Sequence, residues 1–324
     1  MHVRVAALVA LLTLGGCRGG DPELVELTVP SGASFSQVVD TLAARDLVRS
    51  PRVFRAYARI RRNDRNVRSG AYVFEQGERW GSILDDLVAG RVVTTGITIP
   101  EGFTLKQMAE RIAGVTMLDP DSVRARLEQE SHERWDVPGP GLEGYLFPDT
   151  YRFASGTALE TVIGTMVQEY RKQWTPERLA RLEELKMSQH EISTLASIIE
   201  AEAVRNEEMP MISAVFHNRL RLGYLLQADP TVLYALGGHR PRLLYAAIDS
   251  VADNPYNTYT QRGLPPGPIG AFGERALEAA LSPLDTNVLY FVARPDGTHI
   301  FTRSLVEHNR ARVQVREEQG RNDH

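Results

Sequence analysis

The chain is poor in cysteine and in lysine. Its 324 residues contain one cysteine, Cys17, which excludes an internal disulfide and any metal centre built from several thiolates. Only three of the 37 basic residues are lysines, and 41 acidic residues bring the formal net charge to −4. The arginines run through the whole chain, so we expect no bulk nucleic-acid binding. With 43% hydrophobic and 24% charged residues, the composition is that of a globular protein of two or three domains.

Signatures of the common nucleophile and cofactor sites are also missing. The sequence has no Gly-x-Ser-x-Gly elbow, no P-loop, no His-Glu-x-x-His helix and no Gly-x-Gly-x-x-Gly turn. The eight histidines are scattered, and His190, His217 and His299 fall in different expected elements, which favours surface or structural roles. We therefore expect no metal and no cofactor, and look to carboxylates for chemistry.

The N-terminal apolar run is short for a membrane-spanning helix and favours a signal peptide. Val5 to Leu14 is about half of the ~20 residues that a spanning helix needs. Arg4 precedes it, and Gly15, Gly16 and Cys17 follow, which is a signal-peptide pattern. Leu14 to Cys17 resembles a bacterial lipobox, so we expect residues 1–17 to direct export, with lipidation at Cys17. An ordinary signal peptide and an uncleaved N-terminal membrane anchor are the alternatives.

Two segments repeat one pattern at an offset of 70 residues. Leu27 to Gly32 precedes an amphipathic helical pattern that starts at Phe35, and Ile97 to Gly102 precedes one that starts at Leu105. A shorter version runs from Tyr72 to Val88. Each copy predicts a strand, a tight turn and a short helix. Such units resemble LysM-like modules of cell-wall proteins, so we expect a LysM-like α+β domain over residues 24–115; a spacer domain that binds nothing is the alternative.

The remaining chain divides into a connecting segment (116–185), a second domain (186–318) and a short tail (319–324). Residues 119–140 are charged and predicted to be irregular, and a charged helix is expected from Thr175 to about Met187. An arginine-rich helical pattern at 52–68 is explained by a solvated face; contact with anionic lipid or wall polymer is the alternative. We expect residues 316–324 to fray.

Two glutamates near the end of a predicted helix are the candidates for the chemistry. Ser188 and Glu191 form a Ser-x-x-Glu capping box for a helix that ends near Ala203. Glu200 and Glu202 lie on opposite edges of its apolar stripe. A partly desolvated carboxyl has a raised pKa and can donate a proton at neutral pH. Solvated, ordinary carboxylates are the alternative, and periodicity does not rank Glu200 above Glu202.

The segments after this helix suit sugar binding. Met211 to Leu222 predicts a second helix, and Asp229 stands at an expected N-cap before Pro230, although capping alone explains Asp229. The loops 254–260 and 263–269 are rich in Tyr, Asn and Pro. Rigid loops with tyrosines and amides can hold a pyranose ring and its hydroxyls.

Several sequence blocks, in order, resemble the endolytic murein transglycosylases (YceG-like). They are Leu142–Tyr151, Leu195–Glu202, Asn218–Leu220, Leu226–Val232, Pro255–Tyr259, Gly263–Ile269, Tyr290–Ala293 with His299–Phe301, and His308–Asn309. The resemblance covers nearly the whole mature chain. It implies an α+β protein in which a LysM-like domain precedes a catalytic domain of helices on a short sheet, ending in a hairpin around Asp296 and Gly297.

The resemblance also implies site residues and a reaction. Glu200 matches the family's catalytic glutamate, with Glu202 and Asn218 in supporting roles. The expected substrate-binding residues are Gln227, Asp229, Thr231, Tyr256, Asn257, Thr258 and Tyr259. The reaction is lytic cleavage of the β-1,4 bond between N-acetylmuramic acid and N-acetylglucosamine in nascent strands, leaving 1,6-anhydro ends. A hydrolytic muramidase and a non-catalytic wall-binding lipoprotein are the alternatives.

The expected partners are peptidoglycan strands, the membrane through the N-terminal anchor, and peptidoglycan synthases. The expected place is the extracytoplasmic side of the bacterial cell envelope. The chain departs from the family in one respect, because the lipobox-like end stands where a single membrane helix is usual.

Overall fold

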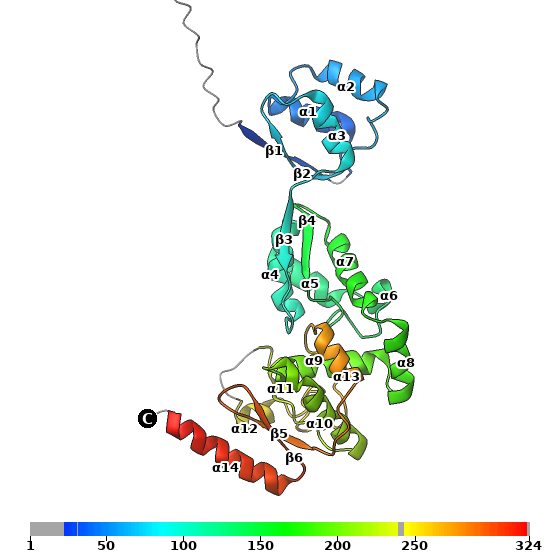
Figure 1. Ribbon diagram of the computed structural model, residues 1–324. Helices are drawn as coiled ribbons and strands as arrows, with labels where there is room; N and C mark the ends of the chain where they lie inside the picture. The colour runs from blue at the N-terminus through cyan, green and yellow to red at the C-terminus, as the bar shows by residue number, and fades with distance from the viewer. Residues whose placement is uncertain (1–22, 31, 239–242, 323–324) are drawn as a thin grey trace, which may run out of the picture. The chain divides into compact units, whose positions relative to one another are not determined.

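The computed structural model describes residues 23–30, 32–238 and 243–322 and divides into two compact units, at Val93 and Thr94 (Figure 1). The expected signal peptide, the lipidation site Cys17 and the last two residues lie outside the described residues. Helices and short antiparallel strands share the chain, which confirms the α+β class.

The first unit consists of a two-stranded antiparallel sheet and three helices. Strand β1 (Leu24–Val29) pairs antiparallel with β2 (Gly70–Glu75), so that Val29 lies opposite Gly70. Helices α1 (Phe35–Ala44), α2 (Pro51–Ile60) and α3 (Trp80–Ala89) bury Leu42, Phe54 and Leu87 in a core of their own. The two strand–turn–helix units expected around residues 27–44 and 72–89 are present.

The third unit of the repeat belongs to the second part of the chain. Strand β3 (Thr94–Thr98) pairs antiparallel with β4 (Thr150–Ala154), and α4 (Leu105–Thr116) packs on β3. The structural boundary at Val93 therefore differs from the one expected at residue 115, because the strand partner of β3 comes from the predicted connecting segment.

The region expected to be irregular contains two helices. Asp119 accepts a hydrogen bond from the Ser122 N–H at 2.9 Å and starts α5 (Pro120–Gln129); α6 (His132–Trp135) follows. The prediction of irregular structure over 119–140 was therefore wrong, because the capping signal outweighed the high charge. Helix α7 (Leu159–Lys172) completes this part.

The C-terminal part gathers helices around α9 (Gln189–Glu202), which packs against α8 (Pro176–Leu185), α10 (Met209–Leu222), α11 (Asp229–Ala235) and α13 (Glu274–Leu281) (Figure 1). The remaining elements are η1 (Asn206–Glu208), α12 (Tyr245–Ser250), β5 (Tyr290–Ala293), β6 (His299–Thr302) and α14 (Leu305–Asn322). The predicted hairpin is confirmed as β5–β6.

Two end predictions need correction. Residues 316–322 continue α14, so the described part of the expected frayed tail is helical. Helix α11 starts at Asp229 with Ala228 as its N-cap, one residue earlier than expected. In the described residues, no helix is both long enough and apolar enough to span a bilayer.

Candidate active site

The two glutamates lie at the end of helix α9, which is largely buried. Its capping box is formed as predicted, with the Glu191 N–H donating to Ser188 Oγ at 3.2 Å and the Ser188 N–H donating to Glu191 Oε2 at 2.7 Å. All residues from Ile192 to Ile199 are buried. Glu200 and Glu202, in the last turn, are both half-buried. The helix thus fixes both carboxyls at the end of a rigid, apolar element.

Glu200 lies against the start of α13. Its Oε2 accepts a hydrogen bond from the Gly273 N–H at 3.0 Å, and Gly273 is the N-cap of α13. Burial raises the pKa of Glu200, the Gly273 N–H opposes this, and the charge of Glu101 raises the pKa further. Such a carboxyl keeps its proton to higher pH than a solvated one and is suited to act as a general acid.

Glu101, which the sequence analysis missed, comes from the turn between β3 and α4. The Gly102 N–H donates to Ala271 O and the Ala271 N–H donates to Phe103 O, each at 2.8 Å. A Cβ built on Gly273 would lie 1.8 Å from Glu101 Oε1, so this carboxylate occupies the space beside the Gly273 Cα. The available signal was a charged residue directly before the turn glycine of the second repeat copy.

Glu202 has a different set of neighbours. Burial, followed by the charge of Asp229, raises the pKa of Glu202 to about 8, while Arg219 and the Asp229 N–H lower it. Arg219 is buried, and its Nε donates to Leu289 O at 2.7 Å and its Nη1 to Leu226 O at 2.6 Å. Both glutamates therefore have raised pKa values, and it is their partners that distinguish them. Arg219 was also missed as a member of this site.

Three of the expected sugar-binding residues are buried and joined to the fold. Thr231 Oγ1 donates to Ala228 O at 2.8 Å and lies 2.9 Å from Thr258 Oγ1, which accepts from the Ala228 N–H at 3.0 Å. Asn257 Nδ2 donates to Ile248 O at 2.9 Å and to Val251 O at 3.1 Å. Asn257, Thr258 and Thr231 are at most 1% exposed. The hydroxyls of Thr231 and Thr258 hold the 227–231 segment against the 256–259 loop, and Asn257 joins that loop to the end of α12.

Three other expected binding residues, on the same 227–231 segment and 256–259 loop, are exposed or half-buried. Gln227 is exposed and has a left-handed φ of 50°. Asp229 is exposed, and its Oδ1 accepts from the Tyr259 hydroxyl at 2.5 Å. Burial raises the pKa of Tyr259, and the charge of Asp229 adds to this, so the phenol stays a hydrogen-bond donor. Asp229 and half-buried Tyr259 thus form one polar group beside Glu202, and Gln227 lies two residues before Asp229 in the chain.

Tyr256 belongs to a third carboxyl environment. Its ring lies 4.8 Å from that of Tyr234, whose hydroxyl donates to Glu143 Oε2 at 3.2 Å. Glu143 Oε1 also accepts from the Leu105 N–H, the first amide of α4, at 3.1 Å. Burial raises the pKa of Glu143 to about 8. No role was predicted for Glu143, although its place inside the apolar segment 142–147 was a signal.

The proline-rich loop 263–269 is locked onto α9. The Ile269 N–H donates to Ser197 Oγ at 3.0 Å. His190 Nε2 lies 2.8 Å from Pro266 O and therefore donates, which leaves Nδ1 to accept from the Tyr145 hydroxyl at 2.6 Å. These contacts fix the position of the loop against α9.

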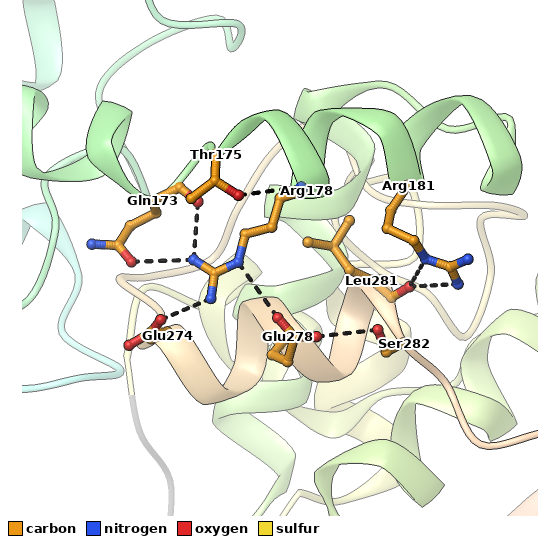
Figure 2. Close-up of polar contacts among 8 residues, drawn as sticks. All are labelled: Gln173, Thr175, Arg178, Arg181, Glu274, Glu278, Leu281 and Ser282. Carbon is orange, nitrogen blue, oxygen red and sulfur yellow. Dashed lines mark hydrogen bonds and ion pairs between the residues drawn. The ribbon is translucent and has the colours of Figure 1, made fainter.

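Helix α13, whose N-cap is Gly273, also contacts α8. Arg178 donates to Gln173 O at 2.9 Å and to Glu274 Oε1 at 2.8 Å, and its Nε lies 3.4 Å from Glu278 Oε2 (Figure 2). Arg181 donates from Nε and Nη2 to Leu281 O at 3.3 and 3.2 Å, as Figure 2 also shows. Two arginines of α8 thus bind α13 near both of its ends, and the N-cap amide of this helix contacts Glu200.

Asn218 and the histidines singled out in the sequence make hydrogen bonds within the fold. Asn218 Nδ2 donates to Thr286 O at 2.8 Å and to Val288 O at 3.0 Å. His217 Nε2 lies 2.9 Å from Ala280 O, and His299 Nδ1 lies 2.7 Å from Glu208 Oε2. Across the described parts of the chain, no three His, Cys, Asp or Glu side chains gather where they could hold a metal ion.

Comparison with known proteins gives consistent matches along the chain. A sequence model of the YceG-like family matches residues 27–314. An endolytic murein transglycosylase of Bacillus subtilis is 36% identical over 309 residues, which cover 89% of this chain and 84% of the relative. One of Streptococcus pneumoniae is 28% identical over 93% of this chain and 62% of its own length. A crystal structure of a YceG-like protein from Listeria monocytogenes matches with a TM-score of 0.62 and 33% identity, covering 90% of this chain and 99% of that one.

Proposed function

Because the chain belongs to the YceG-like family, we propose that it is an endolytic peptidoglycan transglycosylase with Glu200 as its acid. The observation that carries the proposal is the half-buried carboxyl of Glu200 at the end of buried α9. Burial raises the pKa of this carboxyl. The curated relatives at 36% and 28% identity both bear the name of that activity.

One carboxyl is sufficient for this reaction. Protonated Glu200 donates its proton to the bridging oxygen of the β-1,4 bond as that bond breaks. The resulting carboxylate then takes the proton of the muramyl C6 hydroxyl, which attacks the anomeric carbon of its own ring. A hydrolase needs a second carboxylate to act on water or to attack the sugar. Here the nucleophile is already part of the substrate, so the protein chiefly has to hold the sugar and exclude water.

We assign sugar contacts to the half-buried or exposed side chains Gln227, Asp229, Tyr256 and Tyr259. Buried Thr231, Asn257 and Thr258 then support these contacts from behind, as do Glu202 and Asn218. In this arrangement Glu202 orients the polar group at the start of α11 and takes no proton from the substrate.

The decisive experiment is a digest of purified sacculi by the full chain and by Glu200→Gln. We expect 1,6-anhydro products from the wild type and a rate loss of about 10²- to 10⁴-fold in the variant, because general acid catalysis is removed. Glu110→Gln, an exposed residue of α4, is the control and should keep full activity. Undiminished release by Glu200→Gln would refute the single-acid scheme.

Mass spectrometry of the same digest separates the rival functions. A reducing muramyl end is heavier than the anhydro end by one water and would identify a muramidase. Binding to sacculi without soluble fragments would identify a wall-binding protein that performs no catalysis. Thermal unfolding of Glu200→Gln must match or exceed that of the wild type, since a desolvated carboxyl is removed.

The same proposal includes the place of action. We place the enzyme at the extracytoplasmic side of the bacterial envelope, held by its N-terminal segment near peptidoglycan synthases, with the first unit as a LysM-like wall contact. Palmitate labelling of the wild type, set beside Cys17→Ala, distinguishes a lipid anchor from a membrane helix: label that persists in the variant contradicts lipidation at Cys17.

A further inference from the structure

Two carboxylates from distant segments meet at Gly273. Glu200 Oε2 accepts the Gly273 N–H at 3.0 Å, and Glu101 Oε1 fills the space where a Gly273 Cβ would be. Within the described ranges, neither carboxylate takes part in a salt bridge. The turn that carries Glu101 is fixed by the backbone hydrogen bonds of Gly102 and Phe103 with Ala271. These main-chain hydrogen bonds between the Glu101 turn and the segment before Gly273 therefore hold Glu101 beside Glu200.

The other charged groups on elements packed against α9 are directed elsewhere. Glu274 and Glu278 of α13 pair with Arg178 of α8, and His217 of α10 contacts Ala280 O. Arg219 of α10 and Asp229 of α11 act on Glu202. On α8, Arg181 pairs with Glu184, and on α9 itself Glu191 is occupied by the capping box. The remaining charged or titratable residues of these helices are not among the charges that act on Glu200; they are exposed Arg275 of α13, Glu177 and Glu183 of α8, Arg221 of α10, Tyr234 of α11 and His190 of α9.

We propose that Glu101 is a positioning residue of this enzyme, whose negative charge holds Glu200 in the protonated, proton-donating form. This inference rests on the proposed function. Two carboxylates that share a site resist being ionised together, so an ionised Glu101 favours the neutral form of Glu200. The Gly273 N–H, beside the start of α13, stabilises the Glu200 carboxylate and so lowers its pKa. The charge of Glu101 opposes this lowering and leaves the hydrogen bond between Glu200 and Gly273 in place.

The test is the pH–rate profile of Glu101→Gln, with Glu101→Asp and Glu110→Gln beside it. Activity falls as pH rises through the pKa of Glu200, because the acid loses its proton. Removal of the Glu101 charge moves this descending limb to lower pH. We expect rates equal to wild type on the acid side and a loss of about threefold on the alkaline side, the size of an exposed charge interaction.

The other variants separate charge from shape. Glu101→Asp keeps the charge and should move the limb back toward the wild type. Glu110→Gln removes the same charge from α4 at an exposed position and should leave the profile unchanged. A loss that is uniform across pH, or a Glu101→Gln profile that superimposes on the wild type, would overturn the inference.

A titration without substrate gives an independent answer. With glutamate labelled by carbon-13 at the side-chain carboxyl, the signal absent from Glu200→Gln belongs to Glu200. Its midpoint should lie at lower pH in Glu101→Gln than in the wild type; an unchanged midpoint contradicts the role of Glu101. If Glu200→Gln is inactive and the midpoint is unchanged, only this inference fails. An active Glu200→Gln means that the proposed function fails first.

Discussion

The two turns that precede α1 and α4 have nearly the same local structure and different surroundings. Gly32 and Gly102 both have a φ of 77°, and both helices begin with a capping box, Ser34 with Gln37 and Thr104 with Gln107. The first turn lines a cavity of about 290 Å³ within its own unit. The second is hydrogen-bonded to the segment before α13 and brings Glu101 beside Glu200.

The comparison shows where the functional difference between the two copies arises. Local sequence determines the turn and the helix start in both, because the glycine and the capping residues act over a few positions. The chemical role of the second turn depends on its partner, which lies about 170 residues further along the chain. If the proposed role of Glu101 is correct, both copies supply the same local structure and only the second contributes to catalysis.

The largest expected difference between the two helix starts is a dependence on pH. Of the two helices, only α4 has its first amide bound to a half-buried carboxyl, that of Glu143, whose pKa is raised by burial to about 8. Since the folded-state pKa lies above the unfolded one, the unfolded chain loses its proton first. The contribution of Glu143 to stability is therefore greatest below about pH 4.5 and falls until about pH 8. Glu143→Gln, which does not titrate, should reduce that fall by roughly 2 to 4 kcal/mol.

Urea unfolding at pH 5 and pH 8 measures this effect. Trp135 and Trp174 report on the second unit, and a Trp80→Phe background removes the signal of the first unit. Glu202 also has a pKa of about 8, so part of the pH dependence should remain in the variant. Equal losses of stability in Glu143→Gln and its parent would contradict the assignment.

These differences mark what the sequence could and could not predict. The α9 capping box and the β5–β6 hairpin were predicted because each depends on residues a few positions apart. The pairing of β3 with β4 and the approach of Glu101 to Gly273 were not, because periodicity contains no information on partners more than 50 residues away. Glu200 and Glu202 were placed correctly at half-buried edges, while their different neighbours came only with the packing of α11 and α13.

A smaller effect is expected when the partner of the second turn is loosened. Arg178 is largely buried and binds Glu274 and Glu278 of α13 as well as Gln173, which follows α7 (Figure 2). Arg178→Met keeps the aliphatic stem and should cost about 1 to 2 kcal/mol of unfolding free energy, since hydrogen bonds to a charged group are lost. Activity should fall with it, because Gly273 begins the same helix.

The matched control is Arg124→Met on α5. Arg124 lies 3.1 Å from Asp121 in an exposed pair, which contributes less than about 1 kcal/mol. If both arginine variants lose the same stability and keep full activity, the clamp on α13 does not support the site.

The smallest expected effect on stability comes from substituting the turn glycines themselves. Gly32→Ala and Gly102→Ala both force a left-handed φ on alanine, and a Cβ at either position meets nothing within 4 Å. Each should therefore cost about 1 kcal/mol in thermal or urea unfolding. Activity should separate them, because only Gly102 donates its N–H to Ala271 and adjoins Glu101. Release of anhydro products should fall in Gly102→Ala and stay unchanged in Gly32→Ala. An equal loss of activity in both would mean that the second turn serves catalysis no more than the first.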